Sequence, residues 1–161
     1  MKQYTLSARS FAASKQAVLA DPDRLDGDDY EAQRSGWILI ADPDPVLRRR
    51  LADALTADHH QVTEVGTQSA MLELLATSLL ADVPGYALLI CSATLPGWSG
   101  LNMLHALGEA RAAPRIVLLR ERNTDDLLAV AYRVGAAAVL DRRVDAGRLR
   151  TAVNAVLSLA P

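Results

Sequence analysis

From Trp37 onward the sequence alternates between short, largely apolar runs and longer segments whose apolar residues recur at helical spacing. A short apolar run of this kind is typical of a β-strand that is covered on both faces. We predict strands at residues 37–41, 61–65, 86–91, 115–119 and 137–140. Strands that alternate with helices through short connections pair in parallel, and right-handed crossovers then place helices on both faces of the sheet.

The segments between the predicted strands begin and end at recognisable helix caps. Asp44 precedes Pro45, which is the order of an N-cap and a first-turn proline. Thr67 and Asp145 are N-caps of later helices, and Gly135 suits the position after a helix end. The helices are expected to run from Asp44 to Leu55, from Thr67 to about Leu80, from Leu101 to Arg111, from about Thr124 to Val134 and from Asp145 to Leu157. Five strand–helix units predict an α/β, flavodoxin-like fold, which is a doubly wound five-stranded parallel sheet of order 2-1-3-4-5.

Residues 1–35 differ in character from the rest of the chain. The stretch from Asp21 to Glu31 carries six acidic side chains and one arginine. Such a stretch repels itself and offers little to bury, so residues 1–35 are expected to form a flexible, acidic N-terminal extension. Residues 36–161 are then expected to form the folded domain, and we expect no effector domain after the last predicted helix.

Composition and charge exclude several classes of protein. The single cysteine, Cys91, rules out a disulfide framework and a multi-cysteine zinc site. A net charge of −2 and a pI near 5.9 argue against nucleic-acid binding through a basic face. No apolar run approaches the roughly 20 residues of a membrane span. We therefore expect a cytoplasmic protein that binds neither nucleic acid nor a membrane.

The loop after the first predicted strand is the first place to look for a site. In sheets of this kind, ligands bind outside the carboxyl ends of the strands, where the strand order reverses. The loop, Asp42 to Pro45, contains no glycine, which excludes a dinucleotide fingerprint and a phosphate-binding P-loop. Asp44 is chiefly a helix cap, whereas Asp42 ends an apolar strand and is either solvated or paired with a cation.

Three landmarks together resemble the receiver domain (CheY-like) of bacterial two-component response regulators. They are the run from Ile38 to Asp42, the strand from Leu88 to Cys91 with Leu95 to Gly100 after it, and Gly135-Ala136 before the fifth strand. The resemblance covers residues 36–160. It implies that a histidine kinase transfers a phosphoryl group to an aspartate at the end of strand 3. It also implies a Mg²⁺ held by that aspartate and by an acidic pair after strand 1, with a Thr or Ser after strand 4 and a Lys after strand 5 that contact the phosphoryl oxygens.

The resemblance assigns each family position to a residue of this chain, and most of them differ from the family pattern. It places Asp42 and Pro43 at the acidic pair, Ser92 at the phospho-acceptor, Leu119 at the hydroxyl position, Arg142 at the lysine position and Val139 at the aromatic switch position. Asp44, next to Pro43, is the nearest substitute for the missing second acid.

These replacements change the chemistry expected of the pocket. The alcohol of Ser92 cannot form an acyl phosphate, and Leu119 cannot donate to a phosphoryl oxygen. With only Asp42 and Asp44 as weak candidates for Mg²⁺, metal binding is expected to be weak or absent, and no cofactor is expected. Arg142 stays cationic, and we predict that it pairs directly with Asp42. We expect neither phosphotransfer nor another enzymatic activity.

The sequence is therefore interpreted as an atypical, single-domain pseudo-receiver that acts by phosphorylation-independent protein–protein interaction. The expected partner is a histidine kinase or another signalling protein, and a homodimer is a further possibility. The resemblance implies a partner surface on the fourth helix, fifth strand and fifth helix, which carries Leu128, Tyr132, Arg133, Arg148 and Arg150.

Four alternatives stay open at this point. The first is whether the pocket has decayed or been repurposed. The second is a regulator that is still phosphorylated, on an acceptor that has shifted to Ser92 or Thr94. The third is a module that binds an anion or another small molecule at the rim formed by Arg120, Arg122, Arg142 and Arg143. The arginine run at residues 48–50 is either a solvated helix face or a docking patch for an acidic partner.

Overall fold

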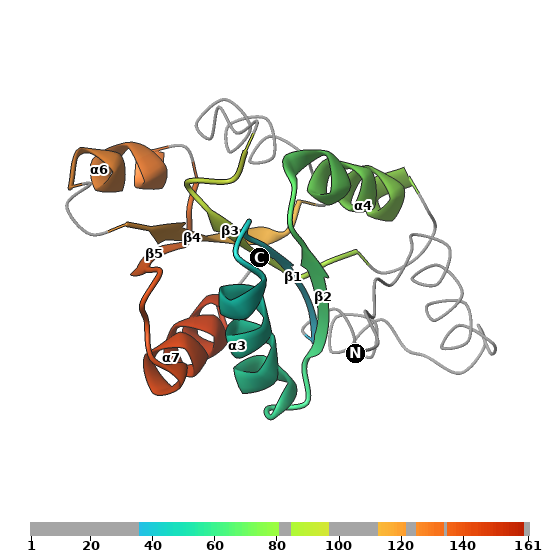
Figure 1. Cartoon of the computed structure of the whole chain (residues 1–161), viewed down its shortest axis with the longest axis horizontal. Coiled ribbons are helices and arrows are strands. Elements are labelled where there is room, and N and C mark those ends of the chain that lie inside the picture. The colour runs from blue at the N-terminus through green and yellow to red at the C-terminus, as the bar shows by residue number, and fades with distance from the viewer. Residues whose placement is uncertain (1–35, 81–84, 97–112, 122–124, 134, 160–161) are drawn as a thin grey trace.

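A computed structural model describes residues 36–80, 85–96, 113–121, 125–133 and 135–159 (Figure 1). The acidic extension predicted at residues 1–35 and the helix predicted at residues 101–111 lie outside the described residues. Within the described part of the chain, no helix is long and apolar enough to cross a membrane.

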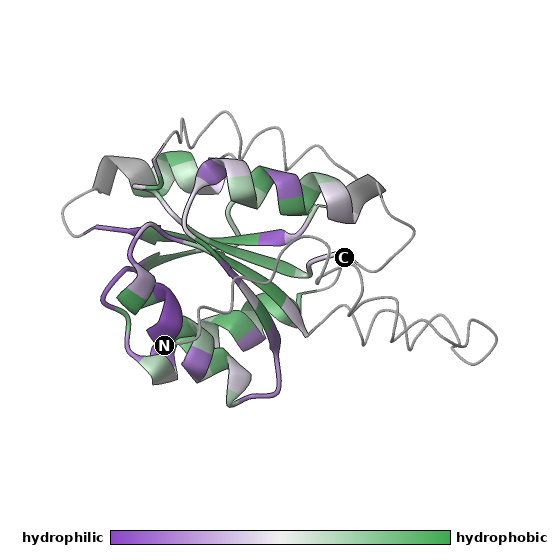
Figure 2. Ribbon diagram, turned by 45° about the vertical axis from the view of Figure 1, so that its right-hand side comes forward, coloured by the Kyte–Doolittle hydropathy of each residue, from purple (hydrophilic) through white to green (hydrophobic). Residues whose placement is uncertain are grey.

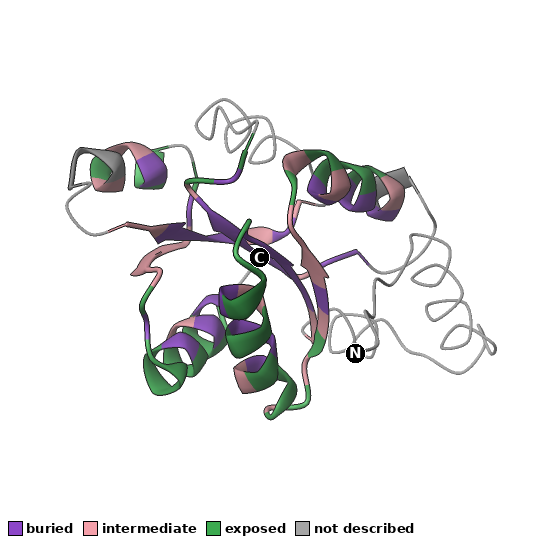
Figure 3. Ribbon diagram, in the orientation of Figure 1, coloured by how far each residue is buried: buried purple, intermediate pink, exposed green. Residues whose placement is uncertain are grey.

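The described strands form one parallel sheet, as predicted. They are β1 (Trp37–Ala41), β2 (Gln61–Val65), β3 (Leu88–Ser92), β4 (Arg115–Arg120) and β5 (Ala138–Asp141). Their order is β2-β1-β3-β4-β5, which confirms the order 2-1-3-4-5. The central strand β3 is buried along its whole length, whereas the edge strands β2 and β5 are mostly half-buried (Figure 3).

Helices cover both faces of this sheet. The helices α3 (Pro45–Thr56) and α7 (Ala146–Leu157) lie on one face, and α4 (Gln68–Leu80) and α6 (Asp125–Arg133) lie on the other (Figure 1). Alternate residues of each strand point to opposite faces, so the sheet has a hydrophobic core on each side. Figure 2 shows the largely hydrophobic strands between the two layers of helices. The core beneath α3 and α7 contains Ile38, Ile40, Leu51, Leu55, Leu88, Ile90, Val117, Leu119, Leu149 and Val153.

The predicted caps are present at the helix ends. The Asp44 carboxylate accepts from the N–H groups of Val46 and Leu47, and the Asp145 carboxylate accepts from that of Arg148. These bonds satisfy backbone donors that the first turn of a helix leaves unpaired. Gly135 has a φ of 99°, the left-handed conformation that glycine adopts at low cost after a helix.

Three of the strands have boundaries that differ from the sequence-based prediction. The strand β3 begins at Leu88 instead of residue 86 and ends at Ser92, and β4 and β5 extend to Arg120 and Asp141. Arg120 and Asp141 are register partners in the ladder between β4 and β5. Main-chain pairing does not require apolar side chains, so the strands continue past the last apolar residue of each run.

Candidate functional site

The sheet brings the residues assigned to the pocket to the carboxyl ends of the strands, on the face that α3 and α7 cover. Asp42 follows β1 by one residue and has the same parity as Ile38 and Ile40, whose side chains pack in that core. Ser92 ends β3 and is the register partner of Leu119 in β4. Arg142 directly follows β5. The topology therefore gathers residues that lie up to one hundred positions apart in the chain.

Asp42 is fully buried, and its carboxylate is bound by a cation of the same chain. The Arg142 guanidinium donates from Nε to Oδ2 at 3.1 Å and from Nη2 to Oδ1 at 2.7 Å. The main-chain N–H of Asp44 donates to Oδ1 at 2.8 Å. A buried carboxylate is costly unless it is paired and hydrogen-bonded, and these contacts meet both conditions. The predicted ion pair between Asp42 and Arg142 is present.

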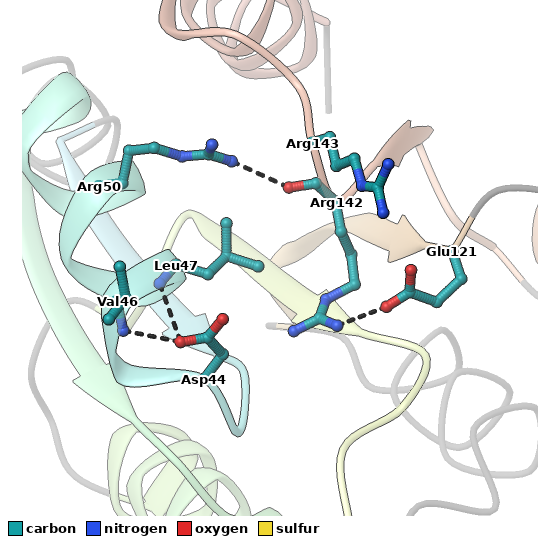
Figure 4. Close-up of a pocket in the computed structure, with 7 residues that line it drawn as sticks. All are labelled: Asp44, Val46, Leu47, Arg50, Glu121, Arg142 and Arg143. Carbon is teal, nitrogen blue, oxygen red and sulfur yellow. Dashed lines mark hydrogen bonds and ion pairs between the residues drawn. The ribbon is translucent and has the colours of Figure 1, made fainter.

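Arg142 binds a second carboxylate as well. Its Nη1 donates to Oε1 of Glu121, which directly follows β4 (Figure 4). Because it also binds Asp42, the guanidinium joins the ends of β1, β4 and β5. Its side chain is 17% exposed. Partial burial opposes the charged form, but the hydrogen bonds to Asp42 and Glu121 outweigh it and raise the pKa of Arg142 above its ordinary value. The guanidinium therefore remains a permanent cation in this position.

The acceptor position holds a buried alcohol. Ser92 is fully buried, and its Oγ accepts from the main-chain N–H of Thr94 at 3.2 Å. A second hydrogen bond of 2.9 Å joins Ser92 Oγ to Thr94 Oγ1, and Thr94 itself is exposed. Leu119, at the hydroxyl position of the resemblance, is fully buried in the apolar core. Ser92 and Leu119 thus offer neither a carboxylate nor a hydroxyl that faces an open pocket.

The donor atoms of this site are a poor match to a divalent cation. Pro43 has no side-chain ligand, and one oxygen of the exposed Asp44 carboxylate caps α3. The Asp42 carboxylate already binds Arg142. Among the described residues, no three His, Cys, Asp or Glu side chains are grouped so that they could hold a metal ion. Asp42 and Asp44, the weak Mg²⁺ candidates, are therefore both used by the protein itself.

An open pocket of about 280 Å³ lies in front of Arg142, between the start of α3 and the turn after β5 (Figure 4). It is lined by Asp44, Val46, Leu47, Arg50, Glu121, Arg142 and Arg143. Of the predicted arginine rim, Arg142 and Arg143 line this pocket, Arg120 is not among its lining residues, and Arg122 lies outside the described residues. Because Asp44 and Glu121 face the arginines, the pocket carries both signs of charge.

The arginine run at the start of α3 contacts neighbouring residues closely. Arg48 donates from Nη1 to the main-chain oxygen of Asp42 at 2.6 Å, and its side chain is 18% exposed. Arg50 donates to the main-chain oxygen of Arg142 at 3.0 Å. Arg49 and Arg50 are both exposed, and Arg49 lies near Asp53 and Glu64. Two of the three arginines therefore belong to the site, which neither interpretation of the run anticipated.

Sequence reasoning also missed Glu121, the second carboxylate bound to Arg142. Its signal was the parity of β4, because Glu121 lies two residues after Leu119 and therefore on the same face. Arg48 carried a weaker signal. It lies one helical turn after the N-cap Asp44, which brings it next to the start of the helix and the end of β1.

The residues assigned to a partner surface fall into two groups. Tyr132 is 50% exposed, Arg133 and Arg148 are exposed, and Leu128 is half-buried. Val139, at the switch position, is a half-buried residue that packs against the core on the α4 and α6 face. Arg150 instead binds Asp58, just after α3, from Nε to Oδ2 at 2.6 Å and from Nη2 to Oδ1. The structure therefore places Arg150 at the contact between α7 and α3.

A second pocket, of about 620 Å³, lies at the opposite edge of the sheet. It is lined by Ala57, Asp58, His59, His60, Gly147, Arg150, Thr151 and Asn154. His59 and His60 lie in the connection between α3 and β2. Cys91 is fully buried in the core, and burial raises the pKa of its thiol to about 12, so it is not a reactive group.

Comparison with known families and structures gives one consistent result. A family model described as "Response regulator receiver domain" matches residues 38–154, from β1 into α7. A response regulator receiver domain protein from Clostridium thermocellum is 19% identical, with a TM-score of 0.67 over 76% of this chain and 94% of its own. A CheY-like receiver domain protein from Methanospirillum hungatei is 18% identical, with a TM-score of 0.64 over 74% and 91%. The solution structure of a response regulator protein from Burkholderia multivorans is 26% identical, with a TM-score of 0.61 over 77% and 96%. No curated protein sequence matches the chain.

Proposed function

The chain belongs to the response regulator receiver domain family, and we propose that it is a pseudo-receiver of two-component signalling that acts by binding a protein partner without being phosphorylated. The observation that carries this proposal is the buried alcohol of Ser92 at the end of β3. An aspartyl phosphate is a mixed anhydride, and its formation requires a carboxylate at the attacking position. An alcohol at this position cannot form that bond, and the Ser92 hydroxyl is covered and bound to Thr94.

The rest of the pocket supports the same conclusion. Asp42 is engaged by Arg142, and the residue opposite Ser92 in β4 is the apolar Leu119. At the switch position Val139 is a β-branched side chain with few rotamers, and no aromatic ring is there to move between two positions. The groups that would sense a phosphoryl oxygen and transmit its presence are therefore replaced.

The proposed partner surface consists of Leu128, Tyr132 and Arg133 of α6 with Arg148 of α7. Tyr132 is a half-exposed aromatic side chain flanked by an exposed arginine, a combination that is enriched in protein interfaces. The partner is a histidine kinase or another signalling protein, and self-association through this surface is the second arrangement.

The first experiment tests phosphorylation. The protein is incubated with acetyl phosphate and Mg²⁺, and its intact mass is measured before and after hydroxylamine. We expect no adduct. A stoichiometric adduct that hydroxylamine removes would show an acyl phosphate on a carboxylate, and an acid-stable adduct lost in Ser92→Ala or Thr94→Ala would show a shifted acceptor. Either outcome would overturn the proposal.

The second experiment tests the partner surface. Proteins retained from lysate are compared for the wild type, Tyr132→Ala and Leu72→Ala, a matched control because Leu72 is an exposed apolar residue of α4. We expect one protein to be lost only with Tyr132→Ala and to be retained equally after acetyl phosphate treatment. Sedimentation of the same variants tests self-association. Retention that does not differ among the variants, together with unchanged sedimentation, would rule out this surface.

A further inference from the structure

At the carboxyl ends of the strands, two carboxylates share one counter-ion. Asp42 is fully buried, and the Glu121 side chain is 45% exposed. Both carboxylates are bound by one guanidinium, whose Nε and Nη2 contact Asp42 and whose Nη1 contacts Glu121. The protein thus places a cation where family members are expected to hold a metal ion between acidic side chains.

We propose that Arg142 replaces the divalent cation of this site, so that the pocket is neutralised from within and does not respond to Mg²⁺. The converse also follows: without the guanidinium, Asp42 and Glu121 form a site for a divalent cation. This inference rests on the proposed function, in which the pocket is not phosphorylated. It explains how the altered pocket stays folded without a metal ion.

Several contacts fix Arg142 in this position. Its main-chain N–H donates to the oxygen of Arg120 at 2.9 Å, and its main-chain oxygen accepts from Arg50. A guanidinium cannot be deprotonated at any accessible pH, and its planar fork matches a carboxylate with two hydrogen bonds. A free cation would have to displace the Arg142 guanidinium from Asp42. Because both residues belong to one chain, the guanidinium has a high effective concentration beside this carboxylate.

The carboxylates alone have the chemistry of a hard-cation site. Magnesium and calcium prefer oxygen ligands, and magnesium is commonly held by one or two carboxylates with water in the remaining positions. In Arg142→Met, the buried Asp42 carboxylate would lose its counter-ion but keep the N–H donor of Asp44. An unpaired buried charge is unfavourable, so a divalent cation that binds there stabilises the folded state.

The experiment measures thermal unfolding of the whole chain with and without about 10 mM MgCl₂, MnCl₂ or CaCl₂. The variants are Arg142→Met, the double variant Asp42→Asn/Arg142→Met, and Arg49→Met as a matched control from an exposed arginine. The cation is expected to change the melting temperature of the wild type, the double variant and Arg49→Met by less than about 1 °C. It is expected to raise the melting temperature of Arg142→Met by at least about 3 °C. A cation-dependent shift in the wild type, or a folded Arg142→Met that does not respond, would overturn the proposal.

A second measurement covers the case in which Arg142→Met does not fold. Recovery of its circular dichroism on addition of Mg²⁺ supports the proposal, whereas a double variant that folds while Arg142→Met stays unfolded in Mg²⁺ overturns it. In the wild type, Mn²⁺ is expected to leave the amide resonances of Ala41, Asp42, Asp44 and residues 92–95 no broader than those of the rest of the domain. Selective broadening there would overturn this inference and leave the proposed function intact, since metal binding alone does not supply an acceptor carboxylate.

Discussion

The guanidinium of Arg48 lies directly against Gly66: a Cβ added to Gly66 would lie 3.0 Å from Nη1 of Arg48. The same Nη1 donates to the main-chain oxygen of Asp42. Gly66 follows β2, so the absence of a side chain there lets an arginine of α3 reach across to the end of β1. Arg142 thus binds the side chain of Asp42, and Arg48 binds its main chain, so two arginines fix the loop that carries Asp42.

Gly66→Ala is therefore expected to displace the Arg48 guanidinium. The added methyl group meets the mobile end of a long side chain, so the structure yields there, and the hydrogen bond to Asp42 is weakened or lost. We predict a destabilisation of about 0.5–1.5 kcal/mol, which is the net contribution of one hydrogen bond. Urea unfolding measures it. In a double-mutant cycle with Arg48→Ala, the two effects should be less than additive, and full additivity would show that Gly66 acts independently of Arg48.

Removing Arg142 should be far more costly than removing an exposed arginine. In Arg142→Met the fully buried Asp42 carboxylate has no counter-ion, and we predict a loss of about 3–5 kcal/mol of unfolding free energy without added cations. The double variant Asp42→Asn/Arg142→Met removes both charges and should recover a large part of that loss. Arg49→Met, which removes only exposed ion pairs, should change stability by less than about 0.5 kcal/mol. Equal losses for Arg142→Met and the double variant would contradict this account.

The fold could be predicted from the sequence because its signals are local and repeated. Most of the strands are short, largely apolar runs, and the caps Asp44 and Asp145 both make the predicted hydrogen bonds. The boundaries were less predictable, because burial does not distinguish a strand residue from a buried residue beside it. Tyr86 is buried but precedes β3, whereas Arg120 and Asp141 are only half-buried and belong to strands.

The candidate site was only partly accessible to the same reasoning. The ion pair between Asp42 and Arg142 could be predicted from the strand order. This order places both residues at the carboxyl ends of the strands, where each is the expected counter-ion of the other. The contribution of Glu121 depends on how far the Arg142 side chain reaches, and that of Arg48 depends on the space beside Gly66. Reach and free space are properties of three-dimensional packing, which strand and helix patterns do not specify.

Cys91 provides a probe of the core, since it is the only cysteine of the chain. It is fully buried in β3, and burial raises the pKa of its thiol to about 12. We predict that Ellman's reagent at pH 8 labels the native protein orders of magnitude more slowly than the protein unfolded in guanidinium chloride. Labelling requires both exposure of the sulfur and formation of the thiolate, and the native state disfavours both. Rapid stoichiometric labelling of the native protein would place Cys91 at the surface instead.

The ion pair between Asp58 and Arg150 predicts how stability depends on pH. The hydrogen bond from Arg150 lowers the pKa of Asp58 below 3.8, and the nearby His60 and His59 act in the same direction. A carboxyl group whose pKa is lower in the folded state stabilises that state above its ordinary pKa, and this contribution is lost as the pH falls through the lowered value. The wild type should therefore be more stable than Asp58→Asn at pH 7, and the difference should shrink as the pH falls below 3.8.

Urea unfolding at a series of pH values measures this difference, with Arg150→Gln as the matched variant that removes the other partner. Because the ion pair is open to solvent on the side of Arg150, whose side chain is 47% exposed, about 0.5 M NaCl should also reduce the difference at pH 7. A difference between wild type and Asp58→Asn that stays constant from pH 7 to below 3.8 would mean that the carboxylate contributes no pH-dependent stability.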